Sequence, residues 1–307
     1  MSGTVTKRQS LIERILYSPR VAPFVFVLPF LLSFSIFFVY PIISTILMSF
    51  ERVLGMHNNV FIGLQNYKRL IDVHFFMAIK TSTLYAFFTI LVLIPIPVIF
   101  SVFLSSRSML GKNLFRSILF VPALTSVIAA GVAFRLIFAD SAAWPANRLM
   151  EFIGVHPVKW QLNYSTGMFI MVVLASWRWM GVNIIYFLSG LHNIPVELYE
   201  SADMDGAGAL SKFVYITLPL LRPIIVYVLT ISIYGGYAMF AESYVYWTEG
   251  TPGDIGLSMV RYIYQQAFGR NDLGYGSAIG IALLAIVFTI NLIQLRFFGL
   301  FRTERTT

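Results

Sequence analysis

The chain has 307 residues, of which 58% are hydrophobic and only 12% are charged. Soluble domains carry about 25% charged residues, so the composition excludes an ordinary soluble protein. The net charge of +8 does not indicate nucleic-acid binding, because the basic residues are scattered among loops, as is typical of membrane flanks. The absence of cysteine excludes disulfides and thiol chemistry.

Three long segments, 21–50, 81–106 and 273–295, contain no charged residue. Because about 20 apolar residues span a bilayer, the sequence predicts an all-α polytopic membrane protein. We expect six transmembrane helices, at about 23–50, 82–106, 117–138, 168–191, 224–240 and 275–297. We expect no cleavable signal peptide, since the first twenty residues are polar and no short apolar core with a cleavage site follows.

These helices are expected to form one transmembrane domain over residues 21–300, between an N-terminal tail, 1–20, and a C-terminal tail, 301–307. An even number of spans places both termini on one side. That side carries 12 Lys and Arg residues and the opposite loops carry eight, so the charge bias predicts cytoplasmic termini. The polar loop 192–222 then also lies in the cytoplasm.

The centre of that loop, 195–223, is a polar, amphipathic island between two apolar spans. Pro195 suits the first turn of a helix, and Asn193 is a suitable cap. Glu197 and Glu200 then lie in the early turns, on the favoured side of the helix dipole. A first short helix is therefore expected here.

The island continues through a turn into a second helix. Asp205, Gly206 and Gly208 are expected to break the first helix. Leu210–Ile216 then predicts a second short helix, which Pro219 is expected to end. The result is a helix–turn–helix at the membrane surface.

This loop resembles the EAA loop of the membrane subunits of ATP-binding-cassette (ABC) importers. The resemblance rests on Glu200-Ser201-Ala202, Asp205-Gly206-Ala207 and Ile216-Thr217-Leu218-Pro219, which have the spacing of that family. Ser201 stands where the family usually has Ala, a small change that leaves the helix intact.

Further motifs extend the resemblance over nearly the whole chain. They are Met48-Ser49-Phe50, 61–67, Phe120-Val121-Pro122, Trp177-Arg178-Trp179 and Gly250-Thr251-Pro252-Gly253. They are similar to the maltose-transporter type of permease, without the extra helices and external domain of the enterobacterial subunit. The block 175–181 favours the six-helix first permease of arabino-oligosaccharide and multiple-sugar importers. The resemblance implies the ABC type I importer permease fold.

The resemblance also implies a division of labour in the cell (inner or cytoplasmic) membrane. This chain would be a non-catalytic subunit that translocates sugar by alternating access, with a homologous second permease, two ATPase subunits and an extracytoplasmic sugar-binding protein. ATP and Mg would bind to the ATPase, since this chain has no Gly-x-x-x-x-Gly-Lys-Ser/Thr loop. We expect no cofactor and no metal site in the chain itself.

The resemblance implies that a short helix of the loop is seated in a groove of the ATPase. Glu200 would pair with a basic residue there, which fixes partner and orientation; the alternative is that Glu200 is merely solvated. The residues expected to couple to the ATPase are Glu197, Glu200, Ser201, Ala202, Asp205, Gly206, Ala207, Leu218 and Pro219.

A sugar path needs aromatic faces for stacking and a few fixed hydrogen-bonding groups. The candidates lie at depths in the membrane that match those of path residues in the family that the chain resembles. They are Thr125, Ser126, Trp177, Arg178, Trp179, Asn183, Tyr234 and Gly235. Arg178 lies mid-helix, where a cation costs at least about 2.5–3.5 kcal/mol. It is either a donor to sugar hydroxyls or a clamp between helices. The pair Gly235-Gly236 suits either helix packing or a sugar approaching the backbone.

Other classes of protein remain alternatives. An ion-coupled secondary transporter would need carboxylates buried in its helices, and the one acidic candidate, Glu242, is expected at the outer end of helix five. The loop 244–272 that follows is expected either to meet the binding protein or to be solvated. Nothing supports a membrane enzyme or channel, because the expected helices contain no paired carboxylates, no metal-binding histidine cluster and no nucleophile motif. Within the importer class, glycerol phosphate or a polyamine is the competing cargo.

Overall fold

The computed structural model describes residues 18–53, 59–106, 109–247 and 252–299. Most of the N-terminal tail, Gly250 and Thr251 of one motif, and the C-terminal tail 301–307 lie outside the described residues. Within them the fold is helical apart from one small antiparallel hairpin, in which Glu51 pairs with Phe61. The hairpin strands are β1 (Glu51–Val53) and β2 (Asn59–Phe61).

Four helical segments are long and apolar enough to cross a membrane, each of 25 to 33 residues. They are α2 (Ala22–Phe34) continued by η1 (Ser35–Val39) and α3 (Tyr40–Ser49), α5 (Val73–Leu93) continued by α6 (Pro95–Ser105), α10 (Tyr164–His192), and α17 (Leu273–Phe297). Two bent pairs raise the number to six when each pair is counted as one span: α7 (Lys112–Leu124) with α8 (Val127–Ile137), and 209–220 with α14 (Arg222–Tyr237). The expected six spans are present on that count.

The third span is not the continuous helix expected over 117–138. Its two halves, α7 and α8, meet at 94°. The break lies at Thr125 and Ser126, whose backbones are extended, and the Thr125 hydroxyl donates to the carbonyl of Pro122 at 2.6 Å. Hydroxyl side chains that bond to nearby backbone offer the chain an alternative to the helix. The expectation of one continuous helix over 117–138 is therefore wrong.

Two other helix boundaries differ from expectation. The second span begins at Val73 rather than near residue 82. Its first turns carry exposed polar side chains, such as those of His74 and Lys80, so hydropathy alone places the start of the span too late. The helix expected over 224–240 is α14, which begins at Arg222 and ends at Tyr237, before the expected end at residue 240. Glu242 therefore does not end this helix.

The segments between spans hold more structure than the sequence predicts. They contain α4 (Gln65–Lys68), α9 (Pro145–Phe152), α15 (Ala241–Tyr246), η3 (Pro252–Asp254), α16 (Met259–Tyr264) and η4 (Gln265–Gly269). Arg261 is 2% exposed and donates to the carbonyls of Ser243 and Trp247 at the end of α15. The expected loop 244–272 is therefore, over much of its described length, a packed part of the body.

α16 is also tied to the start of the second span. The Tyr262 hydroxyl donates to a carboxylate oxygen of Asp72 at 2.9 Å, and it also contacts the hydroxyl of Tyr275. Burial, and after it these hydrogen bonds, raise the pKa of Tyr262 above its ordinary value. The tie holds α16 against the ends of α5 and α17.

The motif residues around the first span also have a structural role. Asn66 on α4 donates to the carbonyls of Ser49 and Glu51 at 3.0 and 2.9 Å, and the Ser49 and Tyr67 hydroxyls lie 2.7 Å apart. These bonds occupy backbone groups at the end of α3. They anchor α4 to the end of the first span and to the start of the hairpin.

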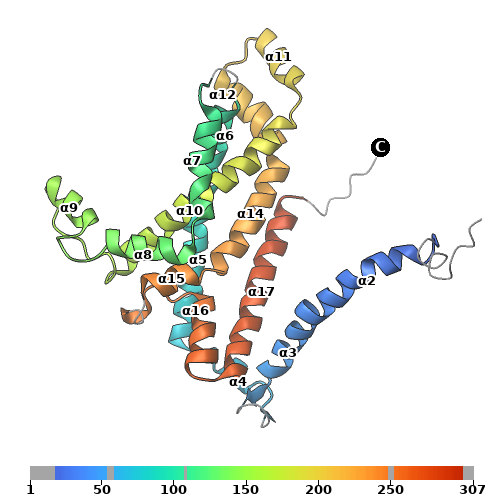
Figure 1. Ribbon diagram of the computed structural model, residues 1–307, viewed down its shortest axis with the longest axis vertical. Helices are drawn as coiled ribbons and strands as arrows, with labels where there is room; N and C mark the ends of the chain where they lie inside the picture. Colours follow the sequence, from blue (N-terminus) through green and yellow to red (C-terminus); the bar gives the residue numbers. More distant parts are fainter. Residues whose placement is uncertain (1–17, 54–58, 107–108, 248–251, 300–307) are drawn as a thin grey trace, which may run out of the picture.

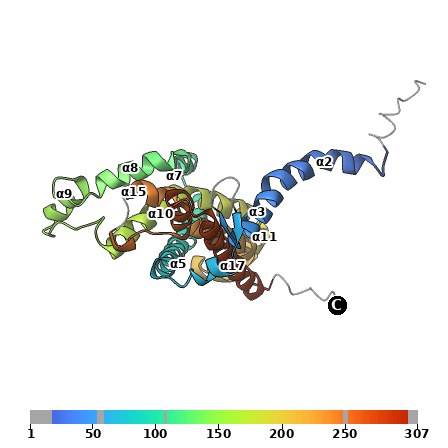
Figure 2. The ribbon, with the colours of Figure 1, turned by 90° about the horizontal axis from the view of Figure 1, so that it is seen from below.

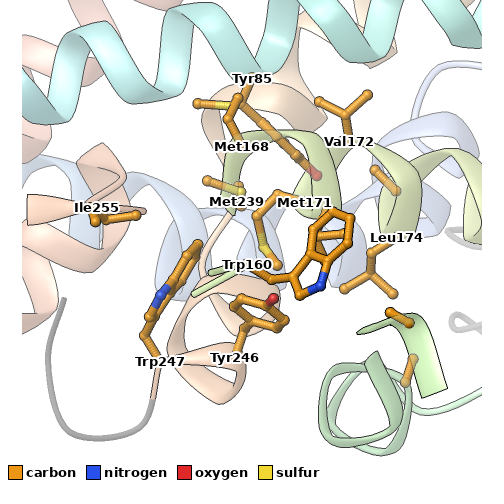
Figure 3. Close-up of a cluster of buried hydrophobic side chains, with 14 residues drawn as sticks. Tyr85, Trp160, Met168, Met171, Val172, Leu174, Met239, Tyr246, Trp247 and Ile255 are labelled. Atoms are coloured by element: carbon orange, nitrogen blue, oxygen red, sulfur yellow. The ribbon is translucent and has the colours of Figure 1, made fainter. Parts of the chain in front are cut away.

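The largest apolar cluster lies where α10 meets α15 and the segments around them (Figure 3). Met171 and Trp160 lie beside Tyr246 in this view, and the rings of Tyr246 and Trp247 meet edge to face at 4.6 Å. By contrast, α2 leaves the body in both views (Figures 1 and 2), and none of its described residues is buried. The first span thus lacks a partner within its own described chain over much of its length.

Candidate functional site

The loop between α10 and α14 forms a helical elbow, which we define as residues 195–221. It comprises α11 (Val196–Met204), α12 (Ala209–Lys212), the π-helical η2 (Phe213–Thr217) and α13 (Leu218–Leu220). Figure 1 shows α11 at one end of the molecule, beyond α6 and α14. All residues of α11 are described and none is buried; Met204 is 89% exposed. The elbow therefore offers an ordered, uncovered helix.

The turn after α11 is a helix-ending motif that needs glycine. Gly206 has a φ of +74°, a left-handed conformation that glycine adopts without steric cost. The N–H of Gly206 donates to the carbonyl of Asp203 at 3.1 Å, and that of Ala207 donates to Ala202 at 2.8 Å. This is the Schellman pattern, which satisfies the last carbonyls of the helix. The expected break at Asp205 and Gly206 is confirmed.

Two details of the elbow differ from expectation. Asn193 ends α10 and does not cap α11, whose capping residue is Pro195 itself. Pro219 does not end the second helix, which runs on to Leu220 before it bends by 65°. The π-helical turn before Pro219 supplies the reason, because its wider hydrogen-bonding pattern accommodates a residue without an N–H.

The elbow is tied together by two side-chain contacts. The hydroxyl of Tyr199 on α11 lies 2.9 Å from that of Thr217, which is buried in η2. Lys212 on α12 pairs with Asp203 on α11 at 2.5 Å. These contacts join α11 to the helix that leads into α14. The elbow is thus braced against the fifth span.

The predicted coupling residues have different exposures. Glu197, Glu200, Ser201, Asp205, Gly206 and Pro219 are exposed, whereas Ala202, Ala207 and Leu218 are half-buried. The exposed acids therefore lie on an outer face, and the half-buried small residues face inward.

A cavity of about 370 Å³ lies between α5, α10, α14 and α15. Its walls carry Tyr85, Thr89, Leu93, Ala175, Trp179, Asn183, Ile231, Ser232, Tyr234, Gly235, Gly236, Ala238, Met239 and Glu242. Four of the predicted path residues, Trp179, Asn183, Tyr234 and Gly235, are among them. Aromatic faces, hydroxyls, one amide and one carboxylate therefore meet in one space. Such a mixture suits a hydroxyl-rich ligand.

Arg178 does not line this cavity but lies behind it. Its Nη1 donates to Oε1 of Glu242 at 3.0 Å, and its guanidinium lies 5.5 Å from the Trp179 ring centroid. Both side chains of the pair are more than four-fifths buried. The contact joins α10 to α15, so the geometry favours the clamp among the two roles expected for Arg178. Glu242, expected at the end of helix five, belongs to α15.

Asn183 combines a place in the wall with a structural task. Its amide nitrogen donates to the carbonyl of Leu93 at 2.8 Å. In an unbroken helix that carbonyl would accept from residue 97, which is Pro97 and has no N–H. Asn183 therefore satisfies a backbone group that proline leaves without its helical partner.

The adjacent glycines of α14 have different roles. A Cβ on Gly236 would lie 2.5 Å from the Cβ of Ala86, so glycine is needed for α14 to approach α5 closely. A Cβ on Gly235 would meet no described atom within 4 Å. Of the two expected uses of this pair, packing thus belongs to Gly236, while Gly235 faces open space.

Besides Arg178, three predicted path residues lie outside the cavity. Thr125 and Ser126 form the break between α7 and α8. Trp177 is 42% exposed and lines a separate, mainly apolar groove between α5 and α10. Because successive residues of a helix point about 100° apart, Trp177 and Trp179 face different sides.

The sequence reasoning also missed cavity residues. Tyr85 and Thr89 on α5 and Ser232 on α14 line the cavity. They lie in apolar spans and belong to no motif, so only their spacing of four residues on α5 could have grouped Tyr85 with Thr89.

Six apolar spans, a cavity between them and an exposed elbow define a membrane transport subunit. The family of inner membrane components of binding-protein-dependent transport systems matches residues 75–302, and the chain belongs to this family. The match covers the cavity and the elbow together.

Curated relatives extend the similarity to almost the full length. The chain is 50% identical to the arabinooligosaccharides transport system permease protein AraP of Bacillus subtilis (strain 168), over 97% of this chain and 95% of that protein. It is 27% identical to the lactose transport system permease protein LacF of Rhizobium radiobacter, over 88% and 91% respectively. These relatives are about as long as this chain.

A solved structure shows the same fold. It is the crystal structure of a bacterial ABC transporter involved in the import of the acidic polysaccharide alginate, with a TM-score of 0.79 and 21% identity. The match covers 92% of this chain and 96% of that one. The chain therefore has the fold of an ABC importer permease.

Proposed function

We propose that this chain is the permease subunit of an ATP-driven, binding-protein-dependent importer for sugars, foremost arabinose-containing oligosaccharides. The observation that carries the proposal is the cavity, in which Tyr85, Trp179 and Tyr234 supply aromatic faces beside polar groups. Sugar rings stack on such faces and bond to such groups. The high identity to an arabinooligosaccharide permease supports this cargo.

The proposed mechanism is alternating access driven by separate ATPase subunits, to which ATP and Mg bind. The exposed α11, braced by Tyr199 and Lys212, supplies a rigid contact for such a partner. Glu200 is exposed on its outer face, where it is free to pair with a basic residue of the ATPase. On this proposal the elbow and both termini lie in the cytoplasm.

We also propose a homologous second permease and an extracytoplasmic sugar-binding protein as partners. The span 22–49 carries many large, exposed apolar side chains. Its most apolar stretch has no residue buried against the rest of the described chain. A second permease would cover part of that surface. For the binding protein, a related structure is described as a complex with an alginate pentasaccharide-bound periplasmic protein.

The cavity disfavours the competing cargos. Recognition of glycerol phosphate calls for Arg or Lys, and none is among the described residues that line the cavity. A polyamine calls for free carboxylates, whereas Glu242 is already paired with Arg178. That pairing also disfavours an ion-coupled mechanism, which needs a carboxylate that exchanges its ion.

The test is transport by the reconstituted importer. The chain is co-expressed with the proposed second permease, the ATPase and the binding protein. The complex is then placed in vesicles without an ion gradient. Uptake of arabino-oligosaccharide that requires ATP and the loaded binding protein is expected. Uptake that needs an ion gradient, or the absence of an ATPase in the purified complex, would refute the proposal.

A further inference from the structure

The charges around the cavity are arranged unequally. Among the described residues that line it, Glu242 alone carries a charge. Its partner Arg178 is 9% exposed and is absent from the lining. The wall that a ligand meets therefore includes Glu242 and not Arg178, whose guanidinium contacts Glu242 and Trp179 from outside the lining.

The cation is also engaged already. Nη1 of Arg178 is committed to Oε1 of Glu242 at 3.0 Å, and its guanidinium lies near Trp179. Nε of Arg178 is buried without a hydrogen-bond partner among the described residues, but Arg178 does not line the cavity, so an anionic ligand would reach it only by displacing Glu242. That displacement would leave a carboxylate uncompensated in a buried site, which is costly. The described wall thus contains no cation that is free to receive an anion.

A neutral sugar meets no such obstacle. A carboxylate is an acceptor with two oxygens and about four lone-pair sites, of which the bond to Arg178 occupies one. Sugar hydroxyls donate to such acceptors, and bonds to a charged acceptor are the stronger ones. Thr89 and Ser232 add hydroxyls on neighbouring walls of the cavity.

We propose that Glu242 is a specificity-determining residue of this permease. Its carboxylate, fixed in the cavity wall by the bond to Arg178, accepts hydrogen bonds from neutral oligosaccharides and rejects sugars that carry carboxylates, such as uronates. This inference rests on the proposed sugar-import function and adds the charge class of the cargo. The acidic class that the structurally similar alginate importer carries is the class this cavity rejects.

The experiment measures binding to the cavity without the binding protein, which would otherwise select the cargo first. The complete transporter, in nanodiscs and without nucleotide, is titrated with arabinotriose and with trigalacturonate by saturation-transfer NMR. We expect arabinotriose to bind at least about tenfold more tightly. Like charges about 5 Å apart at an effective dielectric constant near 20 correspond to a factor above about 100, and the guanidinium of Arg178 offsets part of this repulsion. Equal affinity, or no binding of either sugar, overturns the proposal.

Variants then assign the discrimination to one residue. Glu242→Gln keeps the shape of the side chain and removes its charge. It is expected to reduce the ratio of the affinities for arabinotriose and trigalacturonate about tenfold or more. Glu242→Asp keeps the charge and should keep most of the preference. Ser232→Ala is the matched control in the same wall, expected to change both affinities by a similar factor. An unchanged ratio in Glu242→Gln overturns the assignment.

A second variant covers the case in which Glu242→Gln does not assemble, since it leaves Arg178 buried without its counter-ion. Arg178→Gln combined with Glu242→Gln removes both charges together, a change that proteins tolerate better than loss of one partner. The double variant is expected to lose the discrimination, and retention of the full ratio contradicts the proposal. ATP-driven uptake in wild-type vesicles separates the two claims: without uptake the sugar-import function fails, whereas uptake without charge discrimination refutes only the role of Glu242.

Discussion

Single side chains in this protein compensate for irregularities of the backbone. Asn183 donates to the Leu93 carbonyl that Pro97 leaves without a helical donor. Arg261 donates to the carbonyl of Trp247, which follows α15, and adds a second bond to that of Ser243, which already accepts from the N–H of Trp247. In an apolar environment an unsatisfied carbonyl is costly, so each irregular segment depends on a polar side chain from another element or a later turn.

The role of Asn183 predicts a measurable coupling with Pro97. Asn183→Leu should lower the free energy of unfolding by about 1–3 kcal/mol, because it leaves a buried carbonyl unsatisfied. In a Pro97→Ala background the restored backbone N–H at residue 97 reaches that carbonyl, so the same change should cost less. Thermal unfolding of the four members of this double-mutant cycle gives the coupling. Additive effects would show that Asn183 acts only through packing.

At the scale of whole elements, the arrangement of the helices depends on where they bend and on how closely they approach one another. The 94° break between α7 and α8 turns α8 away from α7, and α8 then packs against α15. The 65° bend after Leu220 separates the elbow from α14. Between α14 and α5 the close approach depends on Gly236, whose added Cβ would meet Ala86.

Two adjacent glycines give a matched pair of substitutions. Gly236→Ala should destabilise the protein by about 1–3 kcal/mol, the usual cost of overpacking, because the Ala86 backbone cannot give way cheaply. Gly235→Ala meets no described atom and should be neutral or stabilising by up to about 1 kcal/mol, as alanine favours the helix. Unfolding temperatures of the two variants in the same detergent test this contrast. Equal losses would contradict the packing described for Gly236.

Across the whole molecule, features with local causes were predictable from the sequence. The turn at Gly206 and the approximate positions of the apolar spans depend on neighbouring residues, and the sequence predicts both. The pairing of Arg178 with Glu242 joins residues 64 positions apart, so no local pattern reveals it. The break at Ser126 lies in an apolar run that continues on both sides, and hydropathy alone cannot distinguish a bent span from a straight one.

At this scale the proposed function depends on the elbow as the contact with the ATPase. Glu200 lies on α11 and is exposed. The described side-chain contacts that hold the elbow together are those of Tyr199 with Thr217 and of Asp203 with Lys212. Glu200→Lys should therefore leave membrane insertion and folding unchanged. It reverses the charge at the proposed interface, where loss of a desolvated pair costs about 2–5 kcal/mol.

We expect Glu200→Lys to abolish transport and to reduce recovery of the ATPase in co-purification. Glu151→Lys is the matched control and should retain both. Glu151 is another exposed acid and belongs to α9, a helix that lies away from α11 in Figure 1. Co-purification, ATPase stimulation by the sugar-loaded binding protein and uptake are measured on the same preparations. A Glu200→Lys complex with wild-type ATPase content and uptake would remove Glu200 from the interface, because a reversed charge in a desolvated contact cannot leave both unchanged.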